Sequence, residues 1–184
     1  MNYHNGTKMI DPHLLFHKVR LTANMHIANF GCGQTGHLVF LPAEMVGKDG
    51  LVYAVDILKE HLTEIKKRAD VGNHHNVHPI WSDIEKVGAT SIPEKTIDVV
   101  YMVNTLVNTN DHHSVMAEAS RLLKDKGRIA VVDWERKGVP YGPSDERHVN
   151  FDQIKIWGRQ NNFAIQEDFQ MGPFHRGVVL YRHE

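Results

Sequence analysis

The chain has 184 residues, a length that suits one domain with a single core and leaves no room for separate cofactor and substrate domains. It carries 21 basic and 22 acidic residues, so its formal net charge of -1 provides no overall field to hold nucleic acid or an anionic membrane. A single cysteine, Cys32, excludes an intramolecular disulfide and a cysteine-based zinc cluster, and it predicts a reducing, cytoplasmic setting.

In the N-terminal segment, residues 1–24, the first 20 residues lack the continuous apolar run of a signal peptide, and no later stretch is long and apolar enough to span a bilayer. We therefore expect a soluble protein. Within the segment, Leu14, Leu15 and Val19 follow a helical spacing. Such a helix either lies as a lid over a ligand site or packs plainly on the core.

A short apolar strand over residues 26–30 leads into three glycines. Gly31 permits the sharp exit from the strand, and Gly33 lets bare backbone approach a ligand. Gly36 allows the next helix to pack closely, and a helix starting near Thr35 would offer free amides to an electron-rich ligand. The spacing is typical of nucleotide-cofactor sites, and a purely structural turn is the alternative.

Strands and helices alternate after the glycines. The pattern predicts a helix over 38–46, a strand over 51–55, a helix over 58–69, strands over 77–81 and 96–102, a helix over 112–123 stopped by Gly127, and a strand over 128–132. Alternation with short turns indicates a mainly parallel sheet covered on both faces, with ligands beyond the carboxyl ends of its strands.

The last third of the chain has a different pattern. A helix is predicted over 150–159, and strands over 163–169 and 178–181 lie too close together for a crossover helix, so they should pair as an antiparallel hairpin. The fold class is therefore α/β, a Rossmann-like, doubly wound, seven-stranded sheet in one domain over 1–184. The longest loop, residues 135–147, follows the fifth strand and is a place where function is common.

Two acidic residues follow neighbouring strands. Asp56 lies about 20 residues beyond the glycines, where a carboxylate can accept hydrogen bonds from ribose hydroxyls, and Asp83 has the equivalent place after the third strand. Both could instead act only as helix or turn caps. Together with the glycines they would line one cleft able to hold an adenosine.

These motifs, in this order, resemble class I S-adenosylmethionine-dependent methyltransferases of the small-molecule type, similar to the ubiquinone and menaquinone biosynthesis enzymes. Residues 27–33 resemble the glycine-rich first motif, 52–57 the ribose motif, 81–84 the adenine motif, 97–104 the fourth motif, and 118–128 the helix end before the fifth strand. The resemblance implies methyl transfer with S-adenosylmethionine as cofactor. The implied cofactor-binding residues are Asn29, Phe30, Gly31, Gly33, Asp56, Ile57, Asp83, Ile84 and Asn104, the last beside the sulfonium.

One position departs from the family pattern. Asn29 stands where the family usually has an acidic residue that helps to hold the cationic methionine portion. Loss of a charge-assisted hydrogen bond costs roughly 1.5 to 3 kcal/mol, so binding would weaken without necessarily disappearing. A non-catalytic cofactor-binding protein with a methyltransferase fold is therefore one alternative. An NAD-dependent oxidoreductase is another, although it would normally need a further substrate region.

The 14 histidines lack the spacing of a metal site, because adjacent ones, such as His112 and His113, point in different directions. No metal is expected. His148 and His175 are the candidate catalytic bases, since the long loop and the hairpin turn should approach the cleft. Trp134 either forms a wall of the substrate site or packs in the loop.

Two residues near the motifs are assigned no chemistry. Cys32 is interpreted as a small residue in a tight bend, and Asp98, at the entrance of the fourth strand, as structural. The acceptor is expected to be a small molecule or a protein side chain, with no nucleic acid and no membrane partner. The sequence does not indicate the acceptor's identity or the oligomeric state.

Overall fold

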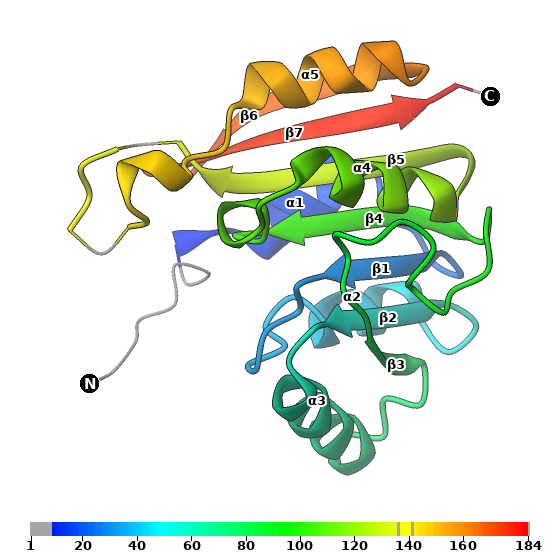
Figure 1. The fold of residues 1–184 in the computed structure, drawn as a ribbon. Coiled ribbons are helices and arrows are strands. Elements are labelled where there is room, and N and C mark those ends of the chain that lie inside the picture. Colours follow the sequence, from blue (N-terminus) through cyan, green and yellow to red (C-terminus); the bar gives the residue numbers. More distant parts are fainter. Residues whose placement is uncertain (1–8, 136, 141, 184) are drawn as a thin grey trace.

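The computed structural model describes residues 9–135, 137–140 and 142–183. One sheet runs through them, with strand order β3-β2-β1-β4-β5-β7-β6 (Figure 1). The strands are β1 (His26–Phe30), β2 (Leu51–Asp56), β3 (Val77–Trp81), β4 (Ile97–Val103), β5 (Leu123–Trp134), β6 (Phe163–Met171) and β7 (His175–Arg182). The helices are α1 (Pro12–Lys18), α2 (Phe40–Val46), α3 (Lys59–Val71), α4 (His112–Leu122) and α5 (Phe151–Gln160), with 3-10 turns η2 (Leu106–Asn108) and η3 (Asp145–Arg147).

Strands β1 to β5 are mutually parallel, and β7 pairs antiparallel with both β5 and β6. This confirms the predicted seven-stranded, mainly parallel α/β sheet with a C-terminal antiparallel hairpin. The chain proceeds outward from β1 through β2 to β3 and then returns to β4 on the other side of β1. The carboxyl ends of β1 and β4 therefore meet at the topological switch point, where ligands bind in such sheets.

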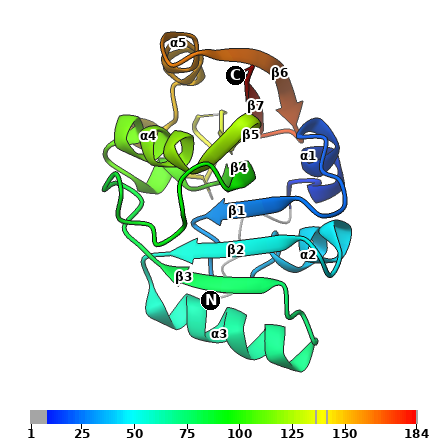
Figure 2. The same cartoon turned by 90° about the vertical axis from the view of Figure 1, so that its right-hand side faces the viewer.

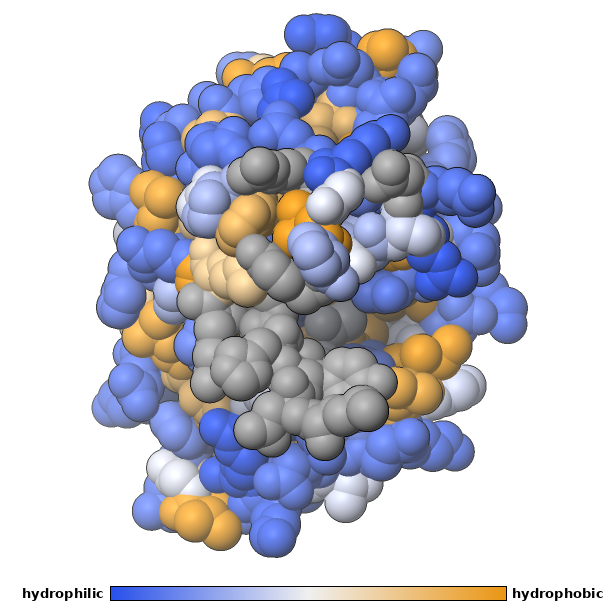
Figure 3. Space-filling view, turned by 90° about the vertical axis from the view of Figure 1, so that its left-hand side faces the viewer, coloured by the Kyte–Doolittle hydropathy of each residue, from blue (hydrophilic) through white to orange (hydrophobic). Residues whose placement is uncertain are grey.

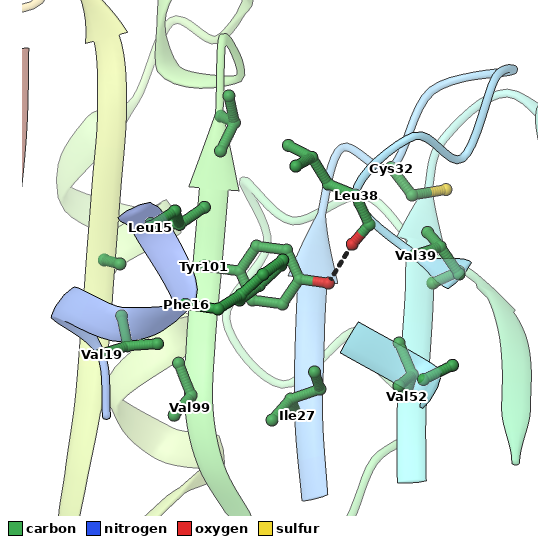
Figure 4. Close-up of a cluster of buried hydrophobic side chains, with 14 of the residues drawn as sticks. Leu15, Phe16, Val19, Ile27, Cys32, Leu38, Val39, Val52, Val99 and Tyr101 are labelled. Atoms are coloured by element: carbon green, nitrogen blue, oxygen red, sulfur yellow. Dashed lines mark hydrogen bonds between the residues drawn. The ribbon is translucent and has the colours of Figure 1, made fainter. Parts of the chain in front are cut away.

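Helices cover both faces of the sheet, as predicted. Figure 2 shows α4 and α5 on one side and α1 and α2 on the other. The buried residues of α3 join the same core cluster as those of α1 and α2. Within that cluster the Tyr101 hydroxyl donates to the carbonyl of Leu38 over 2.6 Å, and Phe16 meets the Tyr101 ring edge-on at 5.4 Å (Figure 4). Helix α1 and the turn before α2 are thus both tied to one buried aromatic residue of β4.

Helix α1 is a packing element of this core. Leu15, Phe16 and Val19 are each at most 1% exposed, and Asp11 caps the helix by accepting from the amides of His13 and Leu14. Residues 1–8 of the proposed lid segment lie outside the described residues, so a lid over the cofactor stays a prediction.

The second core lies between the sheet and helices α4 and α5. Between β3 and β4 the chain forms turns over residues 82–96 in place of a helix, and Ile84 and Ile92 from this loop complete the core. Glu118 of α4 holds the loop because its carboxylate accepts from the amides of Gly88 and Thr90 at 2.7 and 3.0 Å.

The helix expected near Thr35 begins later than predicted, at Phe40. Residues 35–39 are mainly turns, and Gly36 has a φ of 54°, a left-handed conformation that cannot continue a right-handed helix. The close packing expected at Gly36 is confirmed, because an added Cβ would collide with Ile65 of α3 and lie 2.9 Å from the Phe40 ring.

The predicted helix stop at Gly127 was also wrong. Helix α4 ends at Leu122, and β5 begins at once with Leu123, which pairs with Ile97 of β4. Gly127 lies inside this longer strand, after Lys126 at a φ of 62°. Sheet pairing, which a local pattern does not reveal, ends the helix early.

Asp98 is structural, as predicted. Its carboxylate accepts from the backbone amide of His26 and from the Lys124 ammonium, each at 2.8 Å, which ties the entrances of β1, β4 and β5 together. Among the described residues, no helix has the length and apolar character that crossing a membrane requires.

Candidate cofactor site

The glycine turn leaves β1 and bends directly onto the end of β2. The amides of Gly31 and Cys32 both donate to the carbonyl of Val55, at 2.8 and 3.1 Å. Gly31 and Gly33 have φ values of 72° and 64°, which favour glycine. No heavy atom lies within 4 Å of the position that a Cβ on Gly33 would take, so the backbone there is open to a ligand.

Asp56 ends β2 directly beside this turn. Its Oδ2 accepts from the Gly33 amide at 2.9 Å and its Oδ1 from the Leu58 amide at 3.0 Å. The side chain therefore does hold the residue that precedes α3, as the capping alternative expected. The Cys32 thiol donates a weak third hydrogen bond to Oδ2 at 3.9 Å. A carboxylate has about four acceptor positions, so capacity for a ribose hydroxyl remains.

A histidine that the sequence analysis did not single out also faces Asp56. Nδ1 of His61, on α3, lies 3.3 Å from Oδ2 of Asp56, at a distance but not in the orientation of a hydrogen bond. Asp56 is 8% exposed. At the end of β2, a largely buried carboxylate is thus available as a hydrogen-bond acceptor, with the imidazole of His61 beside it.

Asp83 follows β3 at the same edge of the sheet. It accepts from the Glu85 amide at 3.1 Å and pairs with Lys86 at 3.0 Å, and the hydrogen bond from Lys86 is the main cause that lowers the pKa of Asp83. Ile84 is buried in the second core, whereas Ile57 is 53% exposed beside Asp56. The exposed apolar surface at this end of the site therefore comes from Ile57 more than from Ile84.

The remaining residues of the first motif are enclosed. Asn29 is only 2% exposed. Phe30 is fully buried in the second core, so only its backbone is available to the site. Of the two predicted site residues of β1, Asn29 thus brings a polar side chain, whereas the side chain of Phe30 belongs to the core.

Asn104 lies where β4 ends, next to the glycine turn at the switch point. Its φ is 54°, and its amide donates to the carbonyl of Val132 at 2.9 Å. The side-chain Oδ1 is buried and has no hydrogen-bond partner among the described residues. A buried carbonyl without a donor costs free energy, and a bound group with donors or positive charge would offset that cost.

Thr105 supports the site from behind, and the sequence analysis missed it. Its hydroxyl donates to the carbonyl of Phe30 at 2.8 Å, and a Cβ on Gly31 would lie 2.8 Å from both its Cγ2 and its Oγ1. Gly31 is therefore required by this contact as well as by its φ. No local signal marks Thr105, because its partners lie about 75 positions earlier.

Asp133, at the end of β5, is a second residue that sequence reasoning missed. It is 1% exposed, and its Oδ1 and Oδ2 accept from the amides of Trp134 and Val107 at 2.9 and 3.2 Å. Burial raises the pKa of Asp133 to about 7, although these hydrogen bonds oppose the shift. Its neighbours in the sequence are apolar, which conceals a buried acid among strand residues.

The two candidate bases lie in different surroundings. His175, the first residue of β7, is fully buried, its ring lies 4.4 Å from that of Trp134, and neither ring nitrogen has a hydrogen-bond partner among the described residues. Burial lowers the pKa of His175 to about 4. His148 is partly exposed, contacts the carbonyl of Ser144 at 3.2 Å, and lines a hollow of about 300 Å³ between α4 and α5.

Trp134 is 6% exposed and packs against His175 and the loop at Gly142, whose added Cβ would lie 3.5 Å from the Trp134 ring. Burial raises the pKa of the Cys32 thiol well above its usual range, which fits a packing role.

Within the described ranges, no three His, Cys, Asp or Glu side chains lie close enough together to hold a metal ion. Figure 3 views the molecule onto the carboxyl edge, where the described surface is mostly hydrophilic.

The comparisons with known proteins agree with this geometry. Residues 21–168 match the family model described as "Methyltransferase domain". A demethylmenaquinone methyltransferase of Listeria welshimeri is 25% identical over 122 residues, which cover 66% of this chain and 50% of that protein. Aklanonic acid methyltransferase DauC of a Streptomyces species is 29% identical over 104 residues, which cover 56% of this chain and 46% of that one.

The chain thus spans about half the length of the curated relatives that it matches. Among solved structures, a SAM-dependent methyltransferase from Aquifex aeolicus superposes with a TM-score of 0.84 at 20% identity, covering 97% of this chain and 93% of that one. At that identity the likeness concerns the fold. The family model, however, covers most of the chain, and together with the motifs in the described site it shows that this chain belongs to the class I S-adenosylmethionine-dependent methyltransferases.

Proposed function

We propose that the chain transfers the methyl group of S-adenosylmethionine to a small-molecule acceptor. The observation that carries the proposal is the Gly33 and Asp56 pair at the carboxyl ends of β1 and β2, where an open backbone position adjoins a buried carboxylate. When bound, S-adenosylmethionine supplies an electrophilic methyl group on a sulfonium. The protein then contributes orientation, proximity and exclusion of water.

The residues present fit this cofactor. Asp56 retains acceptor capacity for a ribose hydroxyl, and the unpartnered Oδ1 of Asn104 provides a partial negative charge for the methionine end. Asp83 would accept from the adenine amine, with exposed Ile57 and the edge of Ile84 as apolar surface. Gly31 and Gly33 would leave room for the methionine portion.

The proposed acceptor is a small molecule because the two relatives named above carry small-molecule names, demethylmenaquinone and aklanonic acid. His148 is the proposed proton acceptor, since it is the partly exposed member of the two candidate histidines and a neutral imidazole can accept a proton from a substrate. Trp134 is proposed to support the acceptor side of the site through the loop that it packs against.

We also propose a cytoplasmic location, on the ground that Cys32 is a free, buried thiol.

A second candidate function is cofactor binding without methyl transfer. Asn29 favours it, because a neutral amide attracts a cationic methionine portion less strongly than a carboxylate does. The two functions share one binding site and differ in turnover.

Calorimetric titration with S-adenosylmethionine, S-adenosylhomocysteine and, in a parallel cell, NAD tests the proposal. We expect saturable binding of the first two, weakened roughly 10- to 100-fold in Asp56→Ala, since each lost hydrogen bond to a charge contributes about 1.5 to 3 kcal/mol. Asp70→Ala is the matched control, because that carboxylate lies on α3 with a side chain 63% exposed. It should bind normally.

Turnover is measured with S-adenosylmethionine and a panel of quinols and aromatic acids. Formation of methylated product supports methyl transfer, and cofactor binding without product on any of them supports the second candidate. Binding of NAD alone would overturn both.

A further inference from the structure

Asp133 holds the turn that follows β4 in place, and this turn carries two residues of the cofactor site. Its Oδ2 accepts from Val107 in η2, while its Oδ1 accepts from Trp134 at the end of its own strand. On the other side of the same turn, Asn104 places its unpartnered Oδ1 and Thr105 packs behind Gly31. The carboxylate therefore links the end of β5 to the glycine turn through one short loop.

The position of Asp133 makes this link selective for a carboxylate. Val131 belongs to the second core and Val132 to the first, so strand alternation turns Asp133 toward α4 and η2. Both of its oxygens face backbone N–H donors, and an ionised carboxylate accepts from both with charge assistance. In a protonated carboxyl or an amide, one of the two terminal atoms carries a donor hydrogen, which would face a backbone N–H and form no hydrogen bond with it.

We propose that ionised Asp133 is a positioning residue of the cofactor pocket, one that sets the turn 104–108 against Gly31. The inference rests on the proposed function, since the pocket that it shapes is the one assigned to S-adenosylmethionine. It adds a role for a residue that does not touch the cofactor.

The groups around Asp133 set how it titrates. His148 acts on it electrostatically from the segment before α5, and His112 of α4 contacts the carbonyl of Leu106 in the same turn at 2.8 Å. On β7, Arg176 is its register partner, with a side chain paired to Asp168 and Glu135. Because burial raises the pKa of Asp133 to about 7, its carboxylate becomes protonated as the pH falls from about 8 to about 6.

The test combines an NMR titration of the apoprotein with S-adenosylhomocysteine binding. In the wild type, the backbone amide signals of Val107 and Trp134 should shift together with a midpoint near pH 7, and the affinity for S-adenosylhomocysteine should fall about tenfold between pH 8 and pH 5.5. In Asp133→Asn both pH dependences should disappear, with affinity at pH 8 close to the wild-type value at pH 5.5.

Two further measurements separate the outcomes. His148→Gln should keep the Val107 titration and raise its midpoint, since the imidazolium lowers the pKa of Asp133. If Asp133→Asn does not fold, the wild-type carboxyl carbon of Asp133 must titrate with the same midpoint as the Val107 amide. An unchanged Val107 titration in folded Asp133→Asn overturns the inference, whereas failure of the wild type to bind S-adenosylhomocysteine at any pH overturns the proposed function.

Discussion

The Gly33 amide donates to Oδ2 of Asp56 across 2.9 Å, so the glycine turn and the end of β2 form one hydrogen-bonded unit. Each residue fixes the other before any ligand arrives. Preorganisation of this kind lowers the entropy lost on binding, because the backbone and the carboxylate are already in position.

The open space over Gly33 leads to a prediction about Gly33→Ala. The new methyl group has room in the free protein, so the cost to folding is the left-handed strain of about 1 kcal/mol. It would, however, occupy the approach to the ligand, and we expect the affinity for S-adenosylhomocysteine to fall at least tenfold. Gly47→Ala is the control, since Gly47 also has a positive φ and open space. It should lose stability but not affinity.

Glu118 carries a prediction about stability. Burial alone would raise its pKa, but hydrogen bonds from Arg121, Gly88 and Thr90 outweigh burial and lower the pKa to about 2. Glu118→Gln leaves Arg121 with a weaker partner and should cost about 3 kcal/mol of unfolding free energy. Urea denaturation measures this, with Glu94→Gln as control because Glu94 is 68% exposed and 3.7 Å from Arg121.

The sign of the pH dependence follows from the lowered pKa of Glu118. Its stabilisation is complete above the unfolded pKa of about 4.5 and is lost as the pH falls toward 2. Wild-type stability should therefore decline over this range more steeply than that of Glu118→Gln. Parallel curves for the two proteins would contradict the assignment.

The buried His175 predicts a second loss of folding stability in acid, at a higher pH than the loss caused by Glu118. Burial lowers its pKa to about 4 from an ordinary 6.5, so the folded state excludes a proton that the unfolded state binds. Stability is complete above pH 6.5 and falls as the pH drops toward 4, by roughly 3 kcal/mol at most. His175→Leu should remove this dependence and raise stability, since both ring nitrogens lack partners among the described residues. Thermal unfolding at pH 5 and pH 7.5 measures it.

The proposed role of His148 predicts a split between binding and turnover. His148→Gln should reduce kcat roughly a hundredfold, within the usual range for general base catalysis, and leave the dissociation constant of S-adenosylhomocysteine within twofold. His113→Gln is the matched control because His113 lines the same hollow. Equal losses of kcat in both variants would argue against a base at position 148.

Most of the fold follows from local pattern. Buried parallel strands favour apolar residues, and β1 and β2 are mostly buried, so their ends and the residues just beyond them could be predicted. Asp56 and Gly33 are recognisable because their chemistry depends on spacing along the chain. Gly127 does not end α4, because a glycine marks a helix end only where no strand pairing intervenes.

The supporting residues of the site could not be predicted in this way. Thr105 acts on Gly31, and Asp133 acts on Val107, across contacts between residues far apart in the sequence. A threonine in a turn and an aspartate among valines have no local periodicity that reveals a tertiary partner. The same holds for Glu118, whose partners Gly88 and Thr90 lie in a loop that replaces a helix.

The order β5-β7-β6 has a consequence for folding. Because β7 lies between β5 and β6, an interior strand is synthesised after both of its sheet neighbours, and β6 has no sheet neighbour until β7 arrives. Until then β5 presents an unpaired edge, a template for association with other chains. A truncation before His175 would therefore remove the strand that joins β6 to the rest of the sheet, and nascent chains should depend on the rapid docking of β7.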